Sequence, residues 1–310
     1  MTAEPLAQQA HALHRQGRLN EAEALYRQAL VADPQDAASR HFYGVLLAQT
    51  GRKSEALAMF ASALALHPAS AATLFNQGNL LEELGRPEEA LLSFERALGI
   101  KPDVAELWHE RGRALRKLGR LDAALESFTR ALSLKPGYPE ALNARGNCLK
   151  DLGRPEEALR DFDNALSINP ALVAVWCNRG GVLQGQGRLD EALASFDRAI
   201  AADGNSAEGW NNRGSVLKDL GRLDEALSAL DRAIAIRPEL HVALFNRGAV
   251  LWVMERRDEA IISFERACSL NPDYEQELNR LGFNFVLAEA NWNKDFDFRF
   301  GWQDGEKKLN

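Results

Sequence analysis

The sequence repeats itself every 34 residues, and this period limits the possible folds more than any other feature of the chain. The dipeptide Gly-Arg recurs without insertion or deletion at Gly17, Gly51, Gly85, Gly119, Gly153, Gly187 and Gly221, and the next step falls on Glu255-Arg256. A fixed period of this length is typical of repeat arrays, in which each unit buries its apolar face against its neighbours. One array can therefore extend over most of the 310 residues without a domain boundary.

Small and aromatic residues occupy fixed places within each unit. Apolar residues recur at i, i+3, i+4 and i+7 on both sides of the Gly-Arg turn, which predicts two helices per unit. A glycine in the middle of the first helix costs about 1 kcal/mol relative to alanine, so its repetition indicates a neighbouring helix too close for any side chain. The repeated residues are the glycines Gly44, Gly78, Gly112, Gly146, Gly180, Gly214 and Gly248 (Ala10 in the first unit), the large residues Tyr26, Phe60, Phe94, Phe128, Phe162, Phe196, Leu230 and Phe264, and closing prolines such as Pro34 and Pro272.

The Gly-Arg turn predicts where the helices of a unit end and begin. Its glycine is expected to take a positive φ angle after the first helix, because glycine adopts that conformation without steric cost. Asp, Ser or Asn stands three residues later, as in Asp122, Ser54 and Asn20, and suits the start of the second helix.

These positions resemble those of the tetratricopeptide repeat (TPR) family. The resemblance covers residues 3–289, as eight full units and a ninth first-type helix. It implies an all-α fold: a right-handed α-solenoid superhelix of stacked antiparallel helix pairs, with first helices lining a concave groove and second helices outside. Tryptophan at the fourth position of a unit occurs only at Trp108, Trp176 and Trp210, which is a departure within the core.

Asparagines recur on the polar side of the first helices, which the resemblance turns toward the groove. Each costs a helix about 0.5–0.7 kcal/mol relative to alanine, so stability alone does not explain them. An asparagine amide offers one acceptor and two donors, and a ladder of amides could hold an extended peptide by its backbone. The candidate peptide-binding asparagines are Asn76, Asn79, Asn143, Asn147, Asn178, Asn211, Asn212, Asn246 and Asn279.

This arrangement is similar to the groove asparagines of O-GlcNAc transferases, which hold substrate and adaptor peptides. The resemblance implies that role most directly for Asn76, Asn178, Asn212 and Asn246, which share the sixth position of the unit. In the alternative interpretation, the amides bond neighbouring first helices or water and fix the stacking. The aromatic candidates beside them either anchor a ligand or pack under adjacent helices; they are Phe75, Phe245 and Trp252.

Charged residues replace the asparagines in the fourth unit, and a column of arginines recurs beside them in the first helices. The fourth unit replaces the asparagines by a charged belt of Glu106, His109, Glu110, Arg113, Arg116 and Lys117, which is either a solvated face or a selector of a partner of mixed charge. A column of arginines precedes the mid-helix glycine, and acidic residues recur in the second helices. We expect these to form ion pairs between units; they are Arg111, Arg145, Arg179, Arg213 and Arg247, with acids such as Asp163, Asp197 and Asp231.

Several functional classes find no support in the sequence. No nucleophile, phosphate-loop or metal-ligand motif is present, which predicts no enzyme activity, no cofactor and no metal site. The formal net charge of −7 argues against a nucleic-acid or membrane surface. The polar N-terminus lacks the apolar run of a secretory signal, and three scattered cysteines suit a reducing compartment, so we expect a cytoplasmic protein.

The repeat period ends before the last residues of the chain. Residues 290–310 contain Phe296, Phe298, Phe300 and Trp302 in alternation with polar residues or glycine. These aromatics need cover, so this tail is expected to cap the last repeat, to pair with another chain, or to lead into a domain that the chain lacks.

The sequence therefore predicts a protein-interaction scaffold that binds an extended peptide or protein segment in its concave groove. The alternative is the substrate-recognition region of a larger glycosyltransferase whose catalytic domain is absent. Self-association remains open, because repeat arrays also associate through their ends.

Overall fold

The computed structural model describes residues 3–280, which form seventeen α-helices and no strand. Each unit consists of a 13-residue first helix and a 14-residue second helix. In chain order the helices are α1 (Ala3–Arg15), α2 (Leu19–Ala32), α3 (Ala37–Gln49), α4 (Lys53–Leu66), α5 (Ala71–Glu83), α6 (Pro87–Ile100), α7 (Ala105–Lys117), α8 (Leu121–Leu134), α9 (Pro139–Asp151), α10 (Pro155–Ile168), α11 (Val173–Gly185), α12 (Leu189–Ala202), α13 (Ala207–Asp219), α14 (Leu223–Ile236), α15 (His241–Val253), α16 (Arg257–Leu270) and α17 (Asp273–Arg280).

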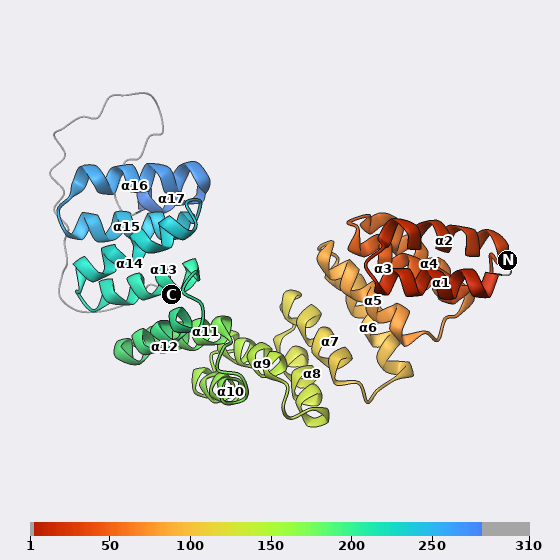
Figure 1. The fold of residues 1–310 in the computed structure, drawn as a ribbon. Coiled ribbons are helices and arrows are strands. Elements are labelled where there is room, and N and C mark those ends of the chain that lie inside the picture. The colour runs from red at the N-terminus through yellow and green to blue at the C-terminus, as the bar shows by residue number, and fades with distance from the viewer. Residues whose placement is uncertain (1–2, 281–310) are drawn as a thin grey trace.

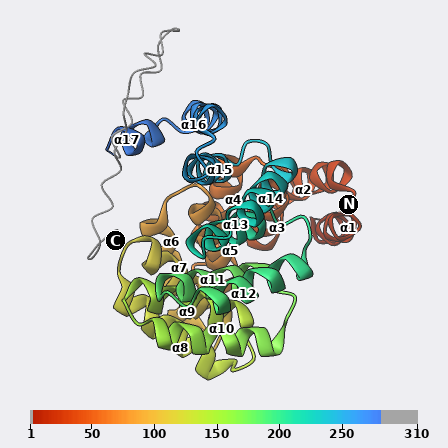
Figure 2. The same cartoon turned by 90° about the vertical axis from the view of Figure 1, so that its left-hand side faces the viewer.

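The helix pairs stack in one curved array, as the sequence predicts. The red N-terminal pairs and the blue C-terminal pairs form two arms, and the pairs from α7 to α12 connect them (Figure 1). Each second helix packs against the first helix of the next unit, and consecutive first helices also contact one another from α1 to α15. Consecutive second helices do not pack to a comparable extent among residues 3–280. The first helices therefore form the inner, more closely spaced layer of the curve, which Figure 2 shows from a second direction.

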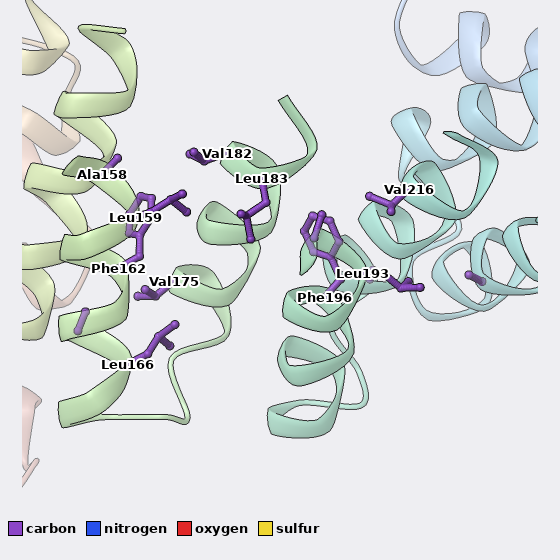
Figure 3. Close-up of a cluster of buried hydrophobic side chains, with 14 of the residues drawn as sticks. Ala158, Leu159, Phe162, Leu166, Val175, Val182, Leu183, Leu193, Phe196 and Val216 are labelled. Atoms are coloured by element: carbon purple, nitrogen blue, oxygen red, sulfur yellow. The ribbon is translucent and has the colours of Figure 1, made fainter. Parts of the chain in front are cut away.

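The large residue of each second helix fills the space between the helices of its own unit. A Cβ atom added to the mid-helix glycine would lie 2.5–2.7 Å from a ring carbon of the phenylalanine sixteen residues later, as for Gly146 and Phe162. Gly214 faces Leu230 in the same way, with 2.6 Å to its Cγ. The expectation of a neighbour too close for a side chain is confirmed, but the neighbour is a side chain rather than a helix backbone. The rings of Phe162 and Phe196 belong to one buried cluster that continues from one unit to the next (Figure 3).

The Gly-Arg turns adopt the expected conformation. All seven turn glycines have φ angles between 70° and 80°, and the eighth turn forces Glu255 to a φ of 61°. The second helix begins directly after the arginine, so Asp122 lies within the first turn of α8 and does not cap it. The residue at the cap position is the arginine itself, as in Arg120, and its side chain makes no cap hydrogen bond.

The turn arginines instead form ion pairs with a glutamate of the second helix that they precede. The Nε and Nη2 atoms of Arg154 donate to the two carboxylate oxygens of Glu157 at 2.7 and 2.8 Å, and this contact holds the pKa of Glu157 below its usual value. The same fork recurs in the other units, except that Ala123 leaves Arg120 without a glutamate. Sequence reasoning missed these pairs, although the repeated Arg-x-x-Glu spacing signals them. The forked pairs are Arg18–Glu21, Arg52–Glu55, Arg86–Glu89, Arg154–Glu157, Arg188–Glu191, Arg222–Glu225 and Arg256–Glu259.

Two expectations about the ends of the array concern residues outside the described part of the chain. The aromatic tail and most of the ninth first-type helix lie there, and α17 describes that helix as far as Arg280. Within residues 3–280, no helix has both the length and the apolar character needed to cross a bilayer.

Candidate functional site

Contacts between consecutive first helices define the inner face of the array. Counting each unit from its first residue (3, 37, 71 and every 34 onward), positions 5, 6, 9, 12 and 13 carry these contacts. Arg116 of α7 contacts Asp151 of α9 at 2.7 Å, and Gln184 of α11 contacts Asp219 of α13 at 2.7 Å. We call the surface formed by these positions the inner face. Every predicted asparagine occupies one of them.

Two amide–amide hydrogen bonds join neighbouring first helices. Asn178 Nδ2 donates to Asn143 Oδ1 at 2.9 Å, and Asn246 Nδ2 donates to Asn211 Oδ1 at 2.9 Å. In both pairs the sixth position of one unit meets the fifth position of the unit before it. Part of the ladder therefore fixes the stacking of the helices, as the alternative interpretation of the sequence expects.

Most of the groove amides nevertheless keep hydrogen-bonding groups available. Asn76, Asn79 and Asn147 are partly exposed, and none of them makes a side-chain hydrogen bond to another described residue. Asn178 and Asn246 use one of their two N–H donors in the bonds above, which leaves the second donor and the carbonyl oxygen. Asn212 only accepts, from Asn211 at 3.1 Å.

Two predicted asparagines stand apart from this set. Asn211 is buried, with 5% of its surface exposed, and its amide both donates to Asn212 and accepts from Asn246. It holds its neighbours in place and does not present its own groups to the groove. The side chain of Asn279 lies outside the described part of the structure.

The aromatic candidates pack against the core with part of their surface exposed. Phe75 lies 6.2 Å from the ring of Phe94. Phe245 stacks on Tyr274 at 4.6 Å. The guanidinium of Arg257 lies 5.4 Å from the ring of Trp252. The structure therefore brings these rings under neighbouring helices, which is one of the two roles that the sequence leaves open.

The charged belt of the fourth unit is an interlocked network. Arg113 pairs with Glu110 at 2.6 Å within α7 and with Glu82 of α5 at 3.2 Å, while Lys117 lies 3.5 Å from Glu82. Burial raises the pKa of Glu110, but His109 and Arg113 outweigh it and leave that pKa below its usual value. The Glu82 side chain is only 4% exposed, and its Oε1 atom has no hydrogen-bond partner in the described residues. The belt is therefore not only a solvated face, because its charged side chains pair between helices and are partly buried.

The arginine column mostly joins successive units, as predicted. Arg179 Nε donates to Asp163 of the preceding unit at 2.7 Å, and its Nη1 donates to Ser195 of its own unit at 2.7 Å. Arg145 differs, because Thr129 stands where the preceding unit should supply an acid, and it makes two 2.7 Å bonds to Asp161 of its own unit instead. The contacts between units are Arg111–Glu95, Arg179–Asp163, Arg213–Asp197 and Arg247–Asp231.

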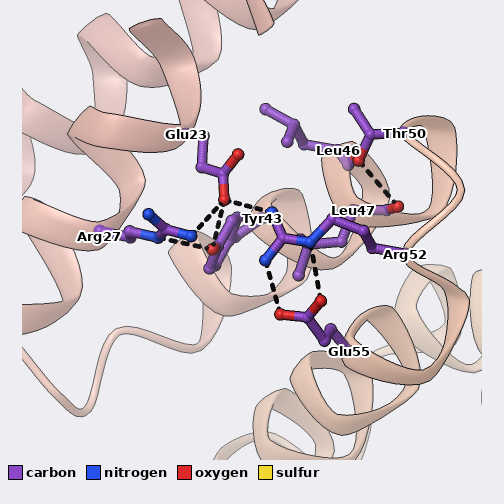
Figure 4. Close-up of polar contacts among 8 residues, drawn as sticks. All are labelled: Glu23, Arg27, Tyr43, Leu46, Leu47, Thr50, Arg52 and Glu55. Atoms are coloured by element: carbon purple, nitrogen blue, oxygen red, sulfur yellow. Dashed lines mark hydrogen bonds and ion pairs between the residues drawn. The ribbon is translucent and has the colours of Figure 1, made fainter. Parts of the chain in front are cut away.

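A separate polar cluster links the first two units at the N-terminal end. Arg52 contacts Glu23 of α2 at 2.5 Å and Glu55 of α4, the helix that it precedes, at 2.6 Å (Figure 4). Tyr43 donates to Glu23 and accepts from Arg27, both at 3.0 Å. Sequence reasoning missed this cluster, which replaces the arginine column in a unit where position 7 is Tyr43.

Among residues 3–280, no group of three metal-ligating side chains comes together, and the three cysteines are unpaired. Burial raises the pKa of Cys177 to about 11, so this thiol is not a reactive thiolate. A cavity of about 330 Å³ lies between α8, α9 and α10 beside Arg145 and Asp161, outside the inner face.

Comparison with known proteins agrees with the helix-pair architecture. A structure of a tetratricopeptide repeat protein from Parabacteroides merdae superposes with a TM-score of 0.66, at 22% identity over 80% of this chain and 98% of that chain. The APC/C hetero-tetramer Cut9–Hcn1 gives a TM-score of 0.63, at 18% identity over 78% and 48% of the chains. MamA from Desulfovibrio magneticus gives 0.52, at 19% identity over 55% and 96%. These likenesses concern the fold. No curated protein matches the chain.

Family models based on sequence cover the array. Models described as tetratricopeptide repeat match residues 13–74, 44–105, 109–172, 177–241 and 241–274. The matches follow one another along the described helices, from the end of α1 to the beginning of α17. The chain therefore belongs to the tetratricopeptide repeat family.

Proposed function

We propose that this protein is an interaction scaffold whose inner face binds an extended polypeptide segment through side-chain amides. The observation that carries the proposal is the unused hydrogen-bonding capacity of Asn76, Asn79 and Asn147. These residues occupy helix positions where alanine is more favourable by about 0.5–0.7 kcal/mol each. Their side chains form no hydrogen bond with another described residue in return, so a ligand is the natural recipient of their donors and acceptors.

The amides suit a polypeptide backbone for a chemical reason. A peptide group presents one N–H donor and one C=O acceptor, and one asparagine side chain can satisfy both. Such contacts do not depend on the side chains of the ligand. The bonds from Asn178 to Asn143 and from Asn246 to Asn211 support the same role indirectly, because they orient amides on neighbouring helices.

The asparagines divide into two groups that an experiment can separate. The triple variant Asn76→Ala, Asn79→Ala and Asn147→Ala removes amides without protein partners, whereas Asn178→Ala with Asn246→Ala removes the bonds between helices. Asn164→Ala, on the exposed face of α10, is the matched control. We expect the triple variant to gain about 1.5–2 kcal/mol of stability from helix propensity while losing peptide binding.

Side-chain amide signals in NMR spectra of the isotope-labelled chain measure binding directly. Addition of an unstructured Gly-Ser-Gln peptide should shift the signals of the three free asparagines and leave Asn164 unchanged. Unchanged signals for all three asparagines at saturating peptide would refute the proposal. The glycosyltransferase alternative stays a prediction, since it requires a catalytic domain in addition to this groove.

A further inference from the structure

The inner face changes character between its centre and its C-terminal half. From α11 to α15 most of its polar side chains are amides, such as Asn178, Gln184 and Asn246. Around α7 and α9 it presents four cations, which we call the cation patch: Arg113, Arg116, Lys117 and Lys150. Because the ladder of amides would hold a peptide backbone along the same face, the patch lies in the path of a bound segment.

The cations of the patch are more exposed than the carboxylates that accompany them. The side chains of Arg113, Arg116 and Lys117 are 38–48% exposed. Glu82 and Glu110 are 4% and 14% exposed, and Asp151 is 29% exposed. The carboxylates therefore form the floor, and the positive groups face the open groove.

Lys150 is the cation without a counter-charge. Contacts between position 12 of one unit and position 13 of the next recur along the inner face, as in Arg116 with Asp151 and Gln184 with Asp219. Lys150 stands at position 12, but the facing residue is Gly185, where an added Cβ would meet no atom within 4 Å. Lys150 forms no ion pair with a described residue, and four cations thus accompany three carboxylates.

Other acids near the patch do not cancel this excess. Glu83 pairs with Lys53 at 3.0 Å, and Glu106 pairs with Lys135 at 2.9 Å. A ligand carboxylate that enters the patch would meet exposed guanidinium and ammonium donors, and bonds of this charge-assisted kind are stronger than neutral ones.

We propose that the cation patch recognises an acidic stretch of the polypeptide that the amide ladder holds, and this inference rests on the proposed function. One feature favours an acidic peptide over a nucleic acid. The patch covers only two units of an acidic chain, so it offers no extended row of cations for a continuous row of phosphates.

Fluorescence anisotropy with the full chain tests the proposal. The probes are a labelled Glu-Gly-Ser repeat peptide and its isosteric Gln-Gly-Ser counterpart. We expect the acidic peptide to bind roughly tenfold more tightly at low salt, with an advantage that shrinks toward physiological salt because exposed charges are screened. A third probe is a poly-uridine oligonucleotide of similar length.

A matched pair of variants locates the effect. Lys117→Gln with Lys150→Gln should remove most of the preference for the acidic peptide. Arg96→Gln with Arg130→Gln removes two exposed cations from the second helices α6 and α8, and it should leave the preference unchanged. Thermal unfolding of both variants verifies that they fold as the parent does.

The outcomes separate this inference from the proposed function. Equal affinity for both peptides would overturn the cation patch and leave the amide groove standing. Binding of neither peptide would overturn both. Tighter binding of the oligonucleotide, lost in the Lys117 and Lys150 variant, would assign the patch to nucleic acid and overturn the peptide inference.

Discussion

The junctions between units and the inner face differ in how strictly they repeat. At four junctions an arginine at position 7 reaches an acid at position 25 of the unit before it, as Arg179 reaches Asp163. On the inner face, position 6 is Asn178 in one unit and Glu110 in another, and position 13 ranges from Asp151 to Gly185. Four of the seven junctions between the eight units thus share one contact, and the helix lengths are the same in all eight units, whereas the residues of the inner face vary. This difference indicates that shape and recognition are encoded at separate positions of the same repeat.

The core that both layers share should give the largest effect when it is disrupted. Phe162→Ala leaves a cavity where a fully buried ring contacts Gly146, and we expect a loss of about 3–5 kcal/mol in the free energy of unfolding. Urea denaturation followed by circular dichroism measures this loss. Phe162→Leu, which copies Leu230 of the seventh unit, should cost much less; an equal cost for both variants would contradict the proposed packing.

The contact of Arg145 within its own unit provides the next test. Arg145→Met leaves Asp161, whose side chain is 5% exposed, as a buried charge without a partner, and should cost about 3 kcal/mol. Arg179→Met leaves Asp163 at 56% exposure, and should cost about 1 kcal/mol or less. Denaturant titrations compare the two variants side by side. Similar losses would show that the contact within a unit and the contact between units are energetically alike despite their different burial.

The eighth turn offers a stabilising change. Glu255 has a φ of 61°, which costs an L-residue about 1–2 kcal/mol, and glycine relieves this at a smaller entropic cost. Glu255→Gly should therefore raise stability by about 0.5–1 kcal/mol in a thermal unfolding experiment. The reciprocal change Gly221→Glu, at a φ of 74°, should lower stability. If neither variant changed the stability, the strain assigned to the eighth turn would be contradicted.

The charged belt should contribute a small dependence on pH. The pKa of Glu110 is lower in the folded chain than its ordinary value, so its contribution to stability is present above the ordinary carboxyl pKa. That contribution declines as the pH falls through the folded pKa. Glu110→Gln should therefore flatten the acid side of a stability–pH profile, with Glu126→Gln on the outer helix α8 as the control. Identical slopes in parent and Glu110→Gln would contradict the role of His109 and Arg113.

The sequence was sufficient to predict the features that recur along the array. The 34-residue period gave the helix pairs, the turn glycines gave the positive φ angles, and the arginine column gave the contacts between units. The amide bond from Asn178 to Asn143 was foreseen only as an alternative, because its geometry depends on the rotation between successive first helices. Nothing in the sequence indicated that Asp161 would take the place of an acid missing at Thr129. Such compensation depends on which side chains are neighbours in one folded unit. A pattern common to all units does not show it.

The constant register between neighbouring units means that the length of the groove can change by a whole repeat. If residues 173–206 were excised, the seventh unit would follow the fifth in the same relation that any two neighbours have now. Arg213 would then face Asp163, Asn212 would face Asn143, and Lys150 would gain Asp219 as a counter-ion. The array is in this sense modular. A variant shortened by one repeat would keep the contacts between units and present a different set of residues on its inner face.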